Sequence, residues 1–222
     1  MSRPQAASAD FAVIFDMDGV LVDSGEAIRR SFEHVLKSYG IEDMPRLHRG
    51  RSLRDVIAEW NNELGTAIDH EHFSRQAAEI EMAELRQKPQ NAHLLALLRE
   101  LREGAVPLAV GTASMSFRTW EILDVLDIRG LFSAVVTADD VQAHKPDPAV
   151  FLAAAEQLVV APDRCIVIED SALGIEAAHR GGMKAIGFAA YHGEPESLKH
   201  ADVLVHDFAE LSYERLLVLA AD

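Results

Sequence analysis

The sequence predicts an α/β fold with a doubly wound (Rossmann-like) parallel sheet and a helical domain inserted after the first strand. Six short, continuous apolar runs are typical of strands that are buried on both faces. Helical patterns lie between most of these runs, and such alternation favours a parallel sheet. A long segment after the first run has helical periodicity but no convincing strand, which indicates the insert.

The elements follow in chain order. The first apolar run, 11–15, ends at Asp16, where a buried strand would leave the sheet. Later runs at 108–110, 134–136, 165–168, 185–188 and 203–205 predict five more strands. Helices are predicted over 94–101, around Phe151, Ala155 and Leu158, and over 175–179, before a Gly181-Gly182 pair suited to a C-terminal cap.

Between these parts, residues 24–91 read as helices. One helical face is formed by Ile28, Phe32, Val35, Leu36 and Tyr39, and further helices are expected over 52–64 and 69–86, the last with Phe73, Ala77 and Ile80. We therefore expect an α/β core of residues 1–23 and 92–222 and an inserted helical domain of residues 24–91. The insert should stand over the carboxyl ends of the strands, where open α/β sheets bind ligands.

Composition excludes several classes of protein. The 222 residues carry 21 Lys and Arg against 36 Asp and Glu, a net charge of −15, so binding to nucleic acid or to an anionic membrane is not expected. A single cysteine, Cys165, excludes a disulfide framework and a cysteine-rich zinc site. Residues 1–10 lack the apolar core of a signal peptide, and no apolar run reaches the roughly 20 residues of a membrane span. We expect a cytoplasmic monomer.

Polar side chains follow four of the predicted strands or the loops after them. They supply four carboxylates, one hydroxyl and one lysine, from Asp16, Asp18, Thr112, Lys145, Glu169 and Asp170. Parallel strands bring their carboxyl ends to one edge, and carboxylates that lie close together require a cation. Oxygen-rich donor sets suit Mg²⁺, and the lysine and hydroxyl complete an anion cradle. The set fits phosphoryl transfer.

These motifs resemble those of the haloacid dehalogenase (HAD) superfamily. Residues 16–24, DMDGVLVDS, look like its first motif, and Thr112, Lys145 and Glu169-Asp170 match the second, third and fourth motifs in order. The resemblance is closest to the subgroup with a helical cap after the first strand. That subgroup contains β-phosphoglucomutase and many phosphatases of small metabolites, including phosphoglycolate phosphatase.

The resemblance implies roles for these residues in phosphoryl transfer. Asp16 resembles the nucleophile that becomes an aspartyl phosphate, and Asp18 the general acid/base. Thr112, with Ala113 beside it, resembles the phosphate-binding segment, and Lys145 the cation that pairs with both phosphate and nucleophile.

The resemblance also implies a Mg²⁺ site. Asp170 resembles a metal ligand, and Glu169 a ligand or the partner of one. The Asp16 carboxylate and the Asp18 backbone carbonyl complete the protein's share of the shell. An aspartate at position 18 is expected of phosphatases and phosphomutases, because an alkoxide leaving group needs a proton.

Three functions remain open. A phosphatase of small phosphorylated metabolites is favoured, because the position of the mutase's histidine, ten residues after the acid/base, holds Ile28. A β-phosphoglucomutase-like mutase is the alternative, and a non-enzymatic phosphate- or partner-binding protein is the second alternative. Phosphoglycolate, sugar phosphates and nucleotides all remain possible substrates.

One candidate for substrate specificity lies in the insert. Arg51 belongs to a basic loop with Arg49 and Arg54 and could reach a carboxylate or a second phosphate of the substrate. The alternative is a solvated loop before a helix that Ser52 caps. Asp23 is expected to be structural, and Glu26 is either a contact to the cap or an exposed acid in a first turn.

Overall fold

The six expected strands form one parallel sheet in the computed structural model, which describes residues 11–45, 47, 50–191 and 195–221. The strand order is β3-β2-β1-β4-β5-β6, and every neighbouring pair is parallel. The strands are β1 (Ala12–Phe15), β2 (Leu108–Gly111), β3 (Ala134–Val136), β4 (Cys165–Glu169), β5 (Lys184–Phe188) and β6 (Val203–Val205). The predicted doubly wound sheet is confirmed.

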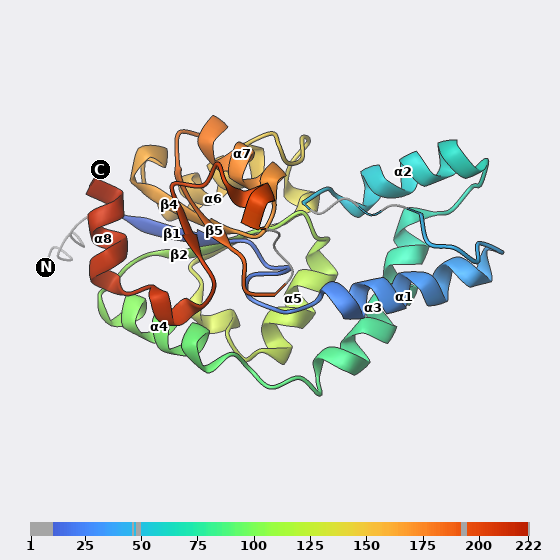
Figure 1. Cartoon of the computed structure of the whole chain (residues 1–222), viewed down its shortest axis with the longest axis horizontal. Coiled ribbons are helices and arrows are strands. Elements are labelled where there is room, and N and C mark those ends of the chain that lie inside the picture. The colour runs from blue at the N-terminus through green and yellow to red at the C-terminus, as the bar shows by residue number, and fades with distance from the viewer. Residues whose placement is uncertain (1–10, 46, 48–49, 192–194, 222) are drawn as a thin grey trace, which may run out of the picture.

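Helices cover both faces of this sheet because alternate strand residues point to opposite sides. Val13 and Phe15 pack with α4 (Ala92–Glu103), α5 (Ser116–Val125) and α8 (Tyr213–Ala221). Ala12 and Ile14 pack with α6 (Ala149–Leu158) and α7 (Ala172–Arg180) on the other face (Figure 1). Short 3₁₀ turns occupy Arg129–Leu131, Ala138–Asp140, Pro162–Arg164, Pro195–Leu198 and Phe208–Glu210.

Between β1 and α4 lie α1 (Gly25–Ser38), α2 (Leu53–Leu64) and α3 (His70–Leu85), called the helical unit below. These helices share a hydrophobic cluster of their own, in which the ring of Phe32 lies 5.2 Å from that of Phe73 and 6.2 Å from that of Trp60. Trp60 is buried in this cluster. Figure 1 shows the helical unit beyond the carboxyl ends of the strands.

Ser52 and Thr112 make different local hydrogen bonds, and only Ser52 caps a helix. The Ser52 side chain accepts a hydrogen bond from the Asp55 amide, which confirms Ser52 as the N-cap of α2. Thr112 is not the cap of a helix, because α5 begins later, after Met115. The Thr112 hydroxyl instead accepts a bond from the Ser114 amide, 3.1 Å away, which folds the segment after β2 into a tight turn.

Two contacts outside the helices tie the helical unit to the rest of the chain. Lys88, after α3, donates to the backbone oxygen of Asp23 at 2.6 Å and contacts the Asp23 carboxylate at 3.2 Å, so the two connecting segments are tied together. This supports a structural role for Asp23. Gly50, at φ +79°, lies so close to α7 that an added Cβ would fall 2.5 Å from the Ser171 Oγ.

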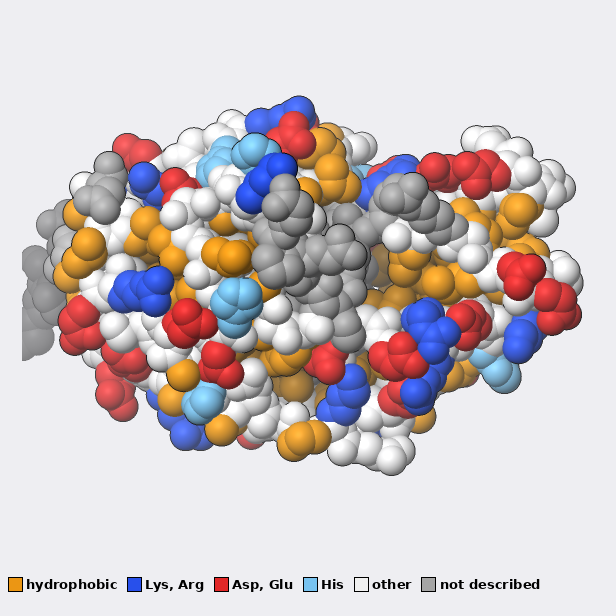
Figure 2. Space-filling view, viewed as in Figure 1, with side chains coloured by type: hydrophobic (Ala, Val, Ile, Leu, Met, Phe, Trp, Pro, Cys, Tyr) orange, Lys and Arg blue, Asp and Glu red, His pale blue; other side chains and the backbone are white. Residues whose placement is uncertain are grey.

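The surface carries both kinds of charge, with acidic and basic side chains interspersed on the face that Figure 2 shows. Among the described residues, no helix is both long enough and apolar enough to cross a membrane.

Candidate active site

The topology places the candidate residues at the middle of one sheet edge. β1 lies between β2 and β4, so the connections run in opposite directions from this point and leave a crevice at the carboxyl ends. Asp16 follows β1 directly, Thr112 follows β2, and Glu169 and Asp170 stand at the end of β4. The sheet therefore gathers three of the four motifs without help from the helical unit.

Lys145 is the cation of this edge. It is 4% exposed, and its Nζ donates to Asp16 Oδ1 at 2.8 Å and to Glu169 Oε1 at 2.6 Å. Its ammonium also lies 4.7 Å from the centre of the Phe151 ring. Burial raises the pKa of Asp16, and the Lys145 charge opposes that rise. Burial would lower the pKa of Lys145, but the two carboxylates raise it, so this side chain stays charged.

Three buried carboxylates form an acidic cluster. Asp16, Glu169 and Asp170 each offer an oxygen, and these oxygens lie within 4.8 Å of one another. An oxygen-only donor set of this kind fits a divalent cation such as Mg²⁺. The loop after β1 packs directly on Asp170, since a Cβ on Gly19 would lie 2.0 Å from its Oδ2.

The structure shows which groups bind each carboxylate oxygen of Glu169. Its Oε1 accepts from Lys145, while its Oε2 accepts from the Ser171 amide at 2.7 Å and from the Ser171 hydroxyl at 2.8 Å. These bonds engage both carboxylate oxygens. The geometry favours the alternative in which Glu169 orients Lys145 and the segment around Asp170.

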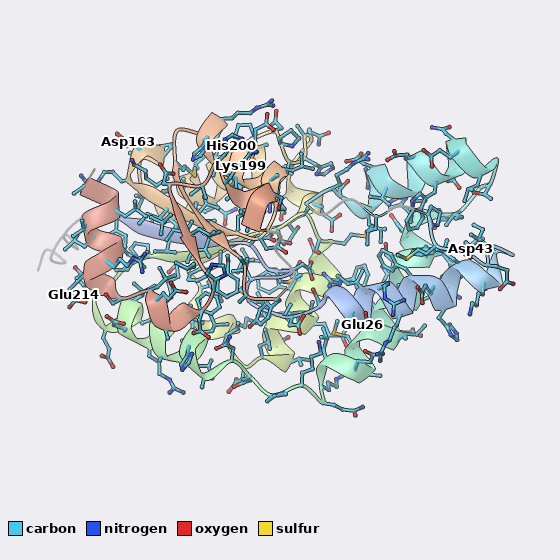
Figure 3. All side chains as sticks on the ribbon, in the orientation of Figure 1. Glu26, Asp43, Asp163, Lys199, His200 and Glu214 are labelled. Atoms are coloured by element: carbon cyan, nitrogen blue, oxygen red, sulfur yellow. The ribbon has the colours of Figure 1, made fainter. Side chains whose placement is uncertain are left out.

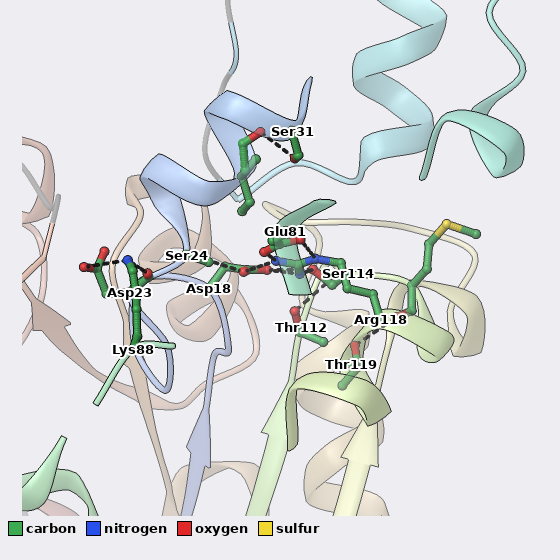
Figure 4. Close-up of polar contacts among 12 residues, drawn as sticks. Asp18, Asp23, Ser24, Ser31, Glu81, Lys88, Thr112, Ser114, Arg118 and Thr119 are labelled. Carbon is green, nitrogen blue, oxygen red and sulfur yellow. Dashed lines mark hydrogen bonds and ion pairs between the residues drawn. The ribbon is translucent and has the colours of Figure 1, made fainter. Parts of the chain in front are cut away.

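Figure 4 shows the partners of Asp18, and they differ from Lys145, the partner of Asp16. Its Oδ1 accepts from Ser24 Oγ and Arg118 Nη2, both at 2.6 Å, and its Oδ2 accepts from Ser114 Oγ and Arg118 Nη1, both at 2.7 Å. Burial by itself would raise the pKa of Asp18, but the Arg118 guanidinium and these bonds lower it to about 2.

The guanidinium of Arg118, on α5, binds a second carboxylate. Its Nε donates to Glu81 Oε2 at 2.8 Å and its Nη2 to Glu81 Oε1 at 2.5 Å. Glu81 belongs to α3 and is 1% exposed. Neither residue follows from the motifs, although Glu81 continues the four-residue spacing of Phe73 and Ala77 and so puts a charge on the apolar face of its helix.

A cavity of about 180 Å³ joins these groups. Asp16, Asp18, Thr112, Lys145 and Asp170 line it from the sheet, whereas Glu169 lies behind Lys145. Ala113 also lines the cavity, so the residues expected to bind phosphate share one space. The opposite wall comes from the helical unit and is largely apolar, with Ile28, Phe32, Leu53, Val56 and Ala77.

Two candidates from the helical unit differ in their positions. Arg51 lines the cavity and pairs with Glu59, which holds its guanidinium at the rim. Its neighbour Arg49 lies outside the described residues. Glu26 pairs with Arg29 and Arg30 at the surface of α1 (Figure 3), and 42% of its side chain is exposed, as expected of an acid in a first turn.

Comparisons with known proteins agree with this geometry. A family model described as haloacid dehalogenase-like hydrolase matches residues 13–188. Fructose-1-phosphate phosphatase YqaB of Escherichia coli (strain K12) is 36% identical over 179 residues, which span 78% of this chain and 94% of that protein. Beta-phosphoglucomutase of Bacillus subtilis (strain 168) is 30% identical over 216 residues, which span 92% of this chain and 93% of that protein.

The fold is shared with solved structures as well. Beta-phosphoglucomutase from Clostridium difficile superposes with a TM-score of 0.81, covering 95% of this chain and 96% of that chain at 23% identity. The chain belongs to the haloacid dehalogenase-like hydrolase family, as the motifs indicated. Within that family it is a phosphoric monoester hydrolase.

Proposed function

We propose that the protein is a Mg²⁺-dependent phosphatase of small phosphorylated sugars that acts through an aspartyl phosphate on Asp16. The observation that carries the proposal is the buried contact of Lys145 with Asp16 and Glu169, beside Asp170, at the floor of the cavity. A nucleophilic carboxylate, a fixed cation and a cluster of oxygen donors are the groups that phosphoryl transfer requires.

The chain's own residues account for both halves of the reaction. An Asp16 oxygen attacks phosphorus while the bond to the leaving oxygen breaks. Asp18, which must first take up a proton from water against the charge of Arg118, donates that proton to the leaving oxygen. Water then attacks the aspartyl phosphate, its proton passes to Asp18, and the bond between phosphorus and the Asp16 oxygen breaks. Lys145 and the Thr112 hydroxyl hold the phosphoryl oxygens in the meantime.

The proposed metal site uses the acidic cluster. Asp16 and Asp170 supply carboxylate oxygens, Asp18 supplies its backbone carbonyl, and Glu169 supports the site through Lys145 and Ser171. When bound, Mg²⁺ stabilises the negative charge that builds up on the transferring phosphoryl group.

The helical unit is the proposed specificity element. We assign residues 24–91 to a cap domain and residues 1–23 and 92–222 to the catalytic core, with the substrate's leaving group lying between them. Arg51, at the rim, is proposed to contact a second anionic group of the substrate. A sugar phosphate is favoured because the relative at 36% identity is a fructose-1-phosphate phosphatase.

The test is phosphate release, with and without Mg²⁺, from fructose 1-phosphate, phosphoglycolate, β-glucose 1-phosphate and a nucleoside monophosphate. We expect Mg²⁺-dependent release, fastest from a sugar phosphate. Asp16→Asn should abolish turnover, whereas the matched control Asp23→Asn, in the same motif but bound to Lys88, should retain it. Normal turnover by Asp16→Asn would exclude the aspartyl phosphate.

A phosphomutase is the second candidate, because a beta-phosphoglucomutase is 30% identical over 92% of this chain. Against it, the cavity wall has Ile28 where the mutases' histidine is expected, so water is the proposed final acceptor. Phosphorus NMR of the β-glucose 1-phosphate reaction distinguishes the two. Appearance of a sugar phosphate isomer faster than free phosphate would favour the mutase.

A further inference from the structure

Arg118 is the described residue that binds Asp18 most extensively. Each oxygen of the Asp18 carboxylate accepts one bond from the guanidinium and one from a serine hydroxyl. A planar guanidinium that contacts both oxygens fixes the plane of the carboxylate as well as its position. The two serines alone leave rotation of the carboxylate less restricted.

Arg118 is fixed in turn by Glu81. The Nε edge of the guanidinium faces Glu81, and the Nη1 and Nη2 edge faces Asp18. Glu81 is almost completely buried, so an ionised carboxylate there is stable only while Arg118 stays beside it. Arg118 therefore cannot turn away from Asp18 without also leaving Glu81 unpaired.

The three residues come from different parts of the chain. Asp18 follows β1, Arg118 lies on α5, which packs against the sheet, and Glu81 lies on α3 of the helical unit. The guanidinium is thus a bridge between the two parts, and it holds its shape only when α3 is seated against α5. In Figure 4 the bridge crosses the space between the end of β1 and the first turns of α5.

We propose that Arg118 is a positioning residue for the acid/base Asp18, and that Glu81 makes this positioning depend on the seating of the helical unit. The inference rests on the proposed phosphatase function. The Arg118–Glu81 pair links the helical unit to the acid/base. In this chain the link does not need the mutases' histidine, whose place Ile28 occupies.

The leaving group provides the test. An alkyl phosphate needs the proton from Asp18 when its ester bond breaks, whereas p-nitrophenyl phosphate releases a stable anion and needs it much less. The experiment compares kcat/KM for the alkyl phosphate that the substrate panel finds fastest with kcat/KM for p-nitrophenyl phosphate. Loss of positioning lowers the first value and largely spares the second, even though removing Arg118 also lets the pKa of Asp18 rise.

Three variants and one control are compared with the unmodified protein. Arg118→Ala should lower kcat/KM for the alkyl phosphate about 100-fold and for p-nitrophenyl phosphate less than about 10-fold, since acid catalysis supplies about 10²–10⁴. Arg118→Lys keeps the charge but not the two-pronged contact and should fall between. Glu81→Gln should show the same selectivity, with a loss of about 10-fold for the alkyl ester. Added guanidinium chloride at millimolar concentration should partly restore Arg118→Ala.

Arg86→Ala is the matched control, because Arg86, the residue directly after α3, and Glu121 on α5 form another ion pair at 2.8 Å, away from Asp18 and largely exposed. It should change neither value by more than about twofold. Equal losses for both esters, or an Arg86→Ala loss as large as that of Glu81→Gln, would overturn the proposal. Thermal unfolding of each variant shows whether it is folded, and Glu81→Gln tests the proposal even if Arg118→Ala does not fold. Failure of the proposed function is distinct, since it would leave Asp16→Asn as active as the unmodified protein.

Discussion

Replacing Lys145 by Met should destabilise the protein strongly. The Lys145 side chain is 1% exposed, and it lies between Asp16 and Glu169, whose side chains are 8% and 0% exposed. Removing one partner of a buried ion pair costs about 3–5 kcal/mol because the remaining charge stays buried without compensation. For a chain of this size, each kcal/mol shifts the unfolding midpoint by about 2–4 °C, so a fall of about 6–20 °C is expected.

The assay is thermal unfolding in buffer without divalent cations, followed by circular dichroism. Lys184→Met is the matched control, because Lys184 is about one-third exposed and lies 3.8 Å from Asp202. An exposed pair of this kind contributes about 0–1 kcal/mol. A midpoint for Lys145→Met within about 2 °C of that for Lys184→Met would refute the reasoning.

Two further measurements test the cause of the loss. Burial raises the pKa of Asp16 in the folded chain, and removing Lys145 removes the charge that opposes this rise. The folded variant therefore takes up protons at a higher pH than the unfolded chain does, so its deficit should shrink as the pH falls from 8 to 5. Adding Glu169→Gln to Lys145→Met removes one of the two uncompensated charges and should recover part of the stability.

Two other predictions concern Gly19 and Cys165. Gly19→Ala and Gly40→Ala both place a side chain at positive φ, at +78° and +76°, which costs about 1–2 kcal/mol. Gly19→Ala should cost more than Gly40→Ala, because its Cβ would overlap Asp170. Only Gly19→Ala should also raise the Mg²⁺ concentration needed for half-maximal activity. Its Cβ would press on Asp170, whereas a Cβ on Gly40 would meet no atom within 4 Å apart from its chain neighbours. Equal Mg²⁺ dependence in the two variants would contradict this. The thiol of Cys165 is buried and its pKa is raised to about 11, so at pH 8 only about a thousandth of the Cys165 side chains are thiolates. Reaction of Cys165 with Ellman's reagent should therefore be complete only after unfolding. Fast reaction of the native protein would show that this strand opens readily.

The sheet could be predicted from sequence because its strands are buried on both faces. A run such as 11–15 has no polar position, which distinguishes it from an exposed strand or a surface helix. Once the strands are parallel, the residues that end them must meet at one edge, so the proximity of Asp16, Thr112 and Glu169 follows from the topology. One helix, α8, did not follow from periodicity, since it has only 9 residues and buries Leu216 alone.

The Arg118–Glu81 pair beside Asp18 could not be predicted in the same way. An arginine in the first turn of α5 has the pattern of a solvated side chain, and only the packing of α3 against α5 brings Glu81 to it. The one sequence signal is the position of Glu81 on the apolar face of α3. A carboxylate buried there requires a cation from another element, and periodicity alone does not tell which cation that is.

The two aspartates of the first motif are thus held by separate cations, and this separation has a mechanistic consequence. Lys145 binds Asp16 and Glu169, which both belong to the sheet edge, so the nucleophile is fixed whether or not the helical unit is seated. Arg118 depends on Glu81, so the acid/base is sensitive to the helical unit. Disturbing the helical unit should therefore impair protonation of the leaving group more than attack on phosphorus. An ester whose leaving group needs no proton should still react while the helical unit is displaced. A sugar phosphate, whose leaving group needs the proton, should react only when α3 packs against α5.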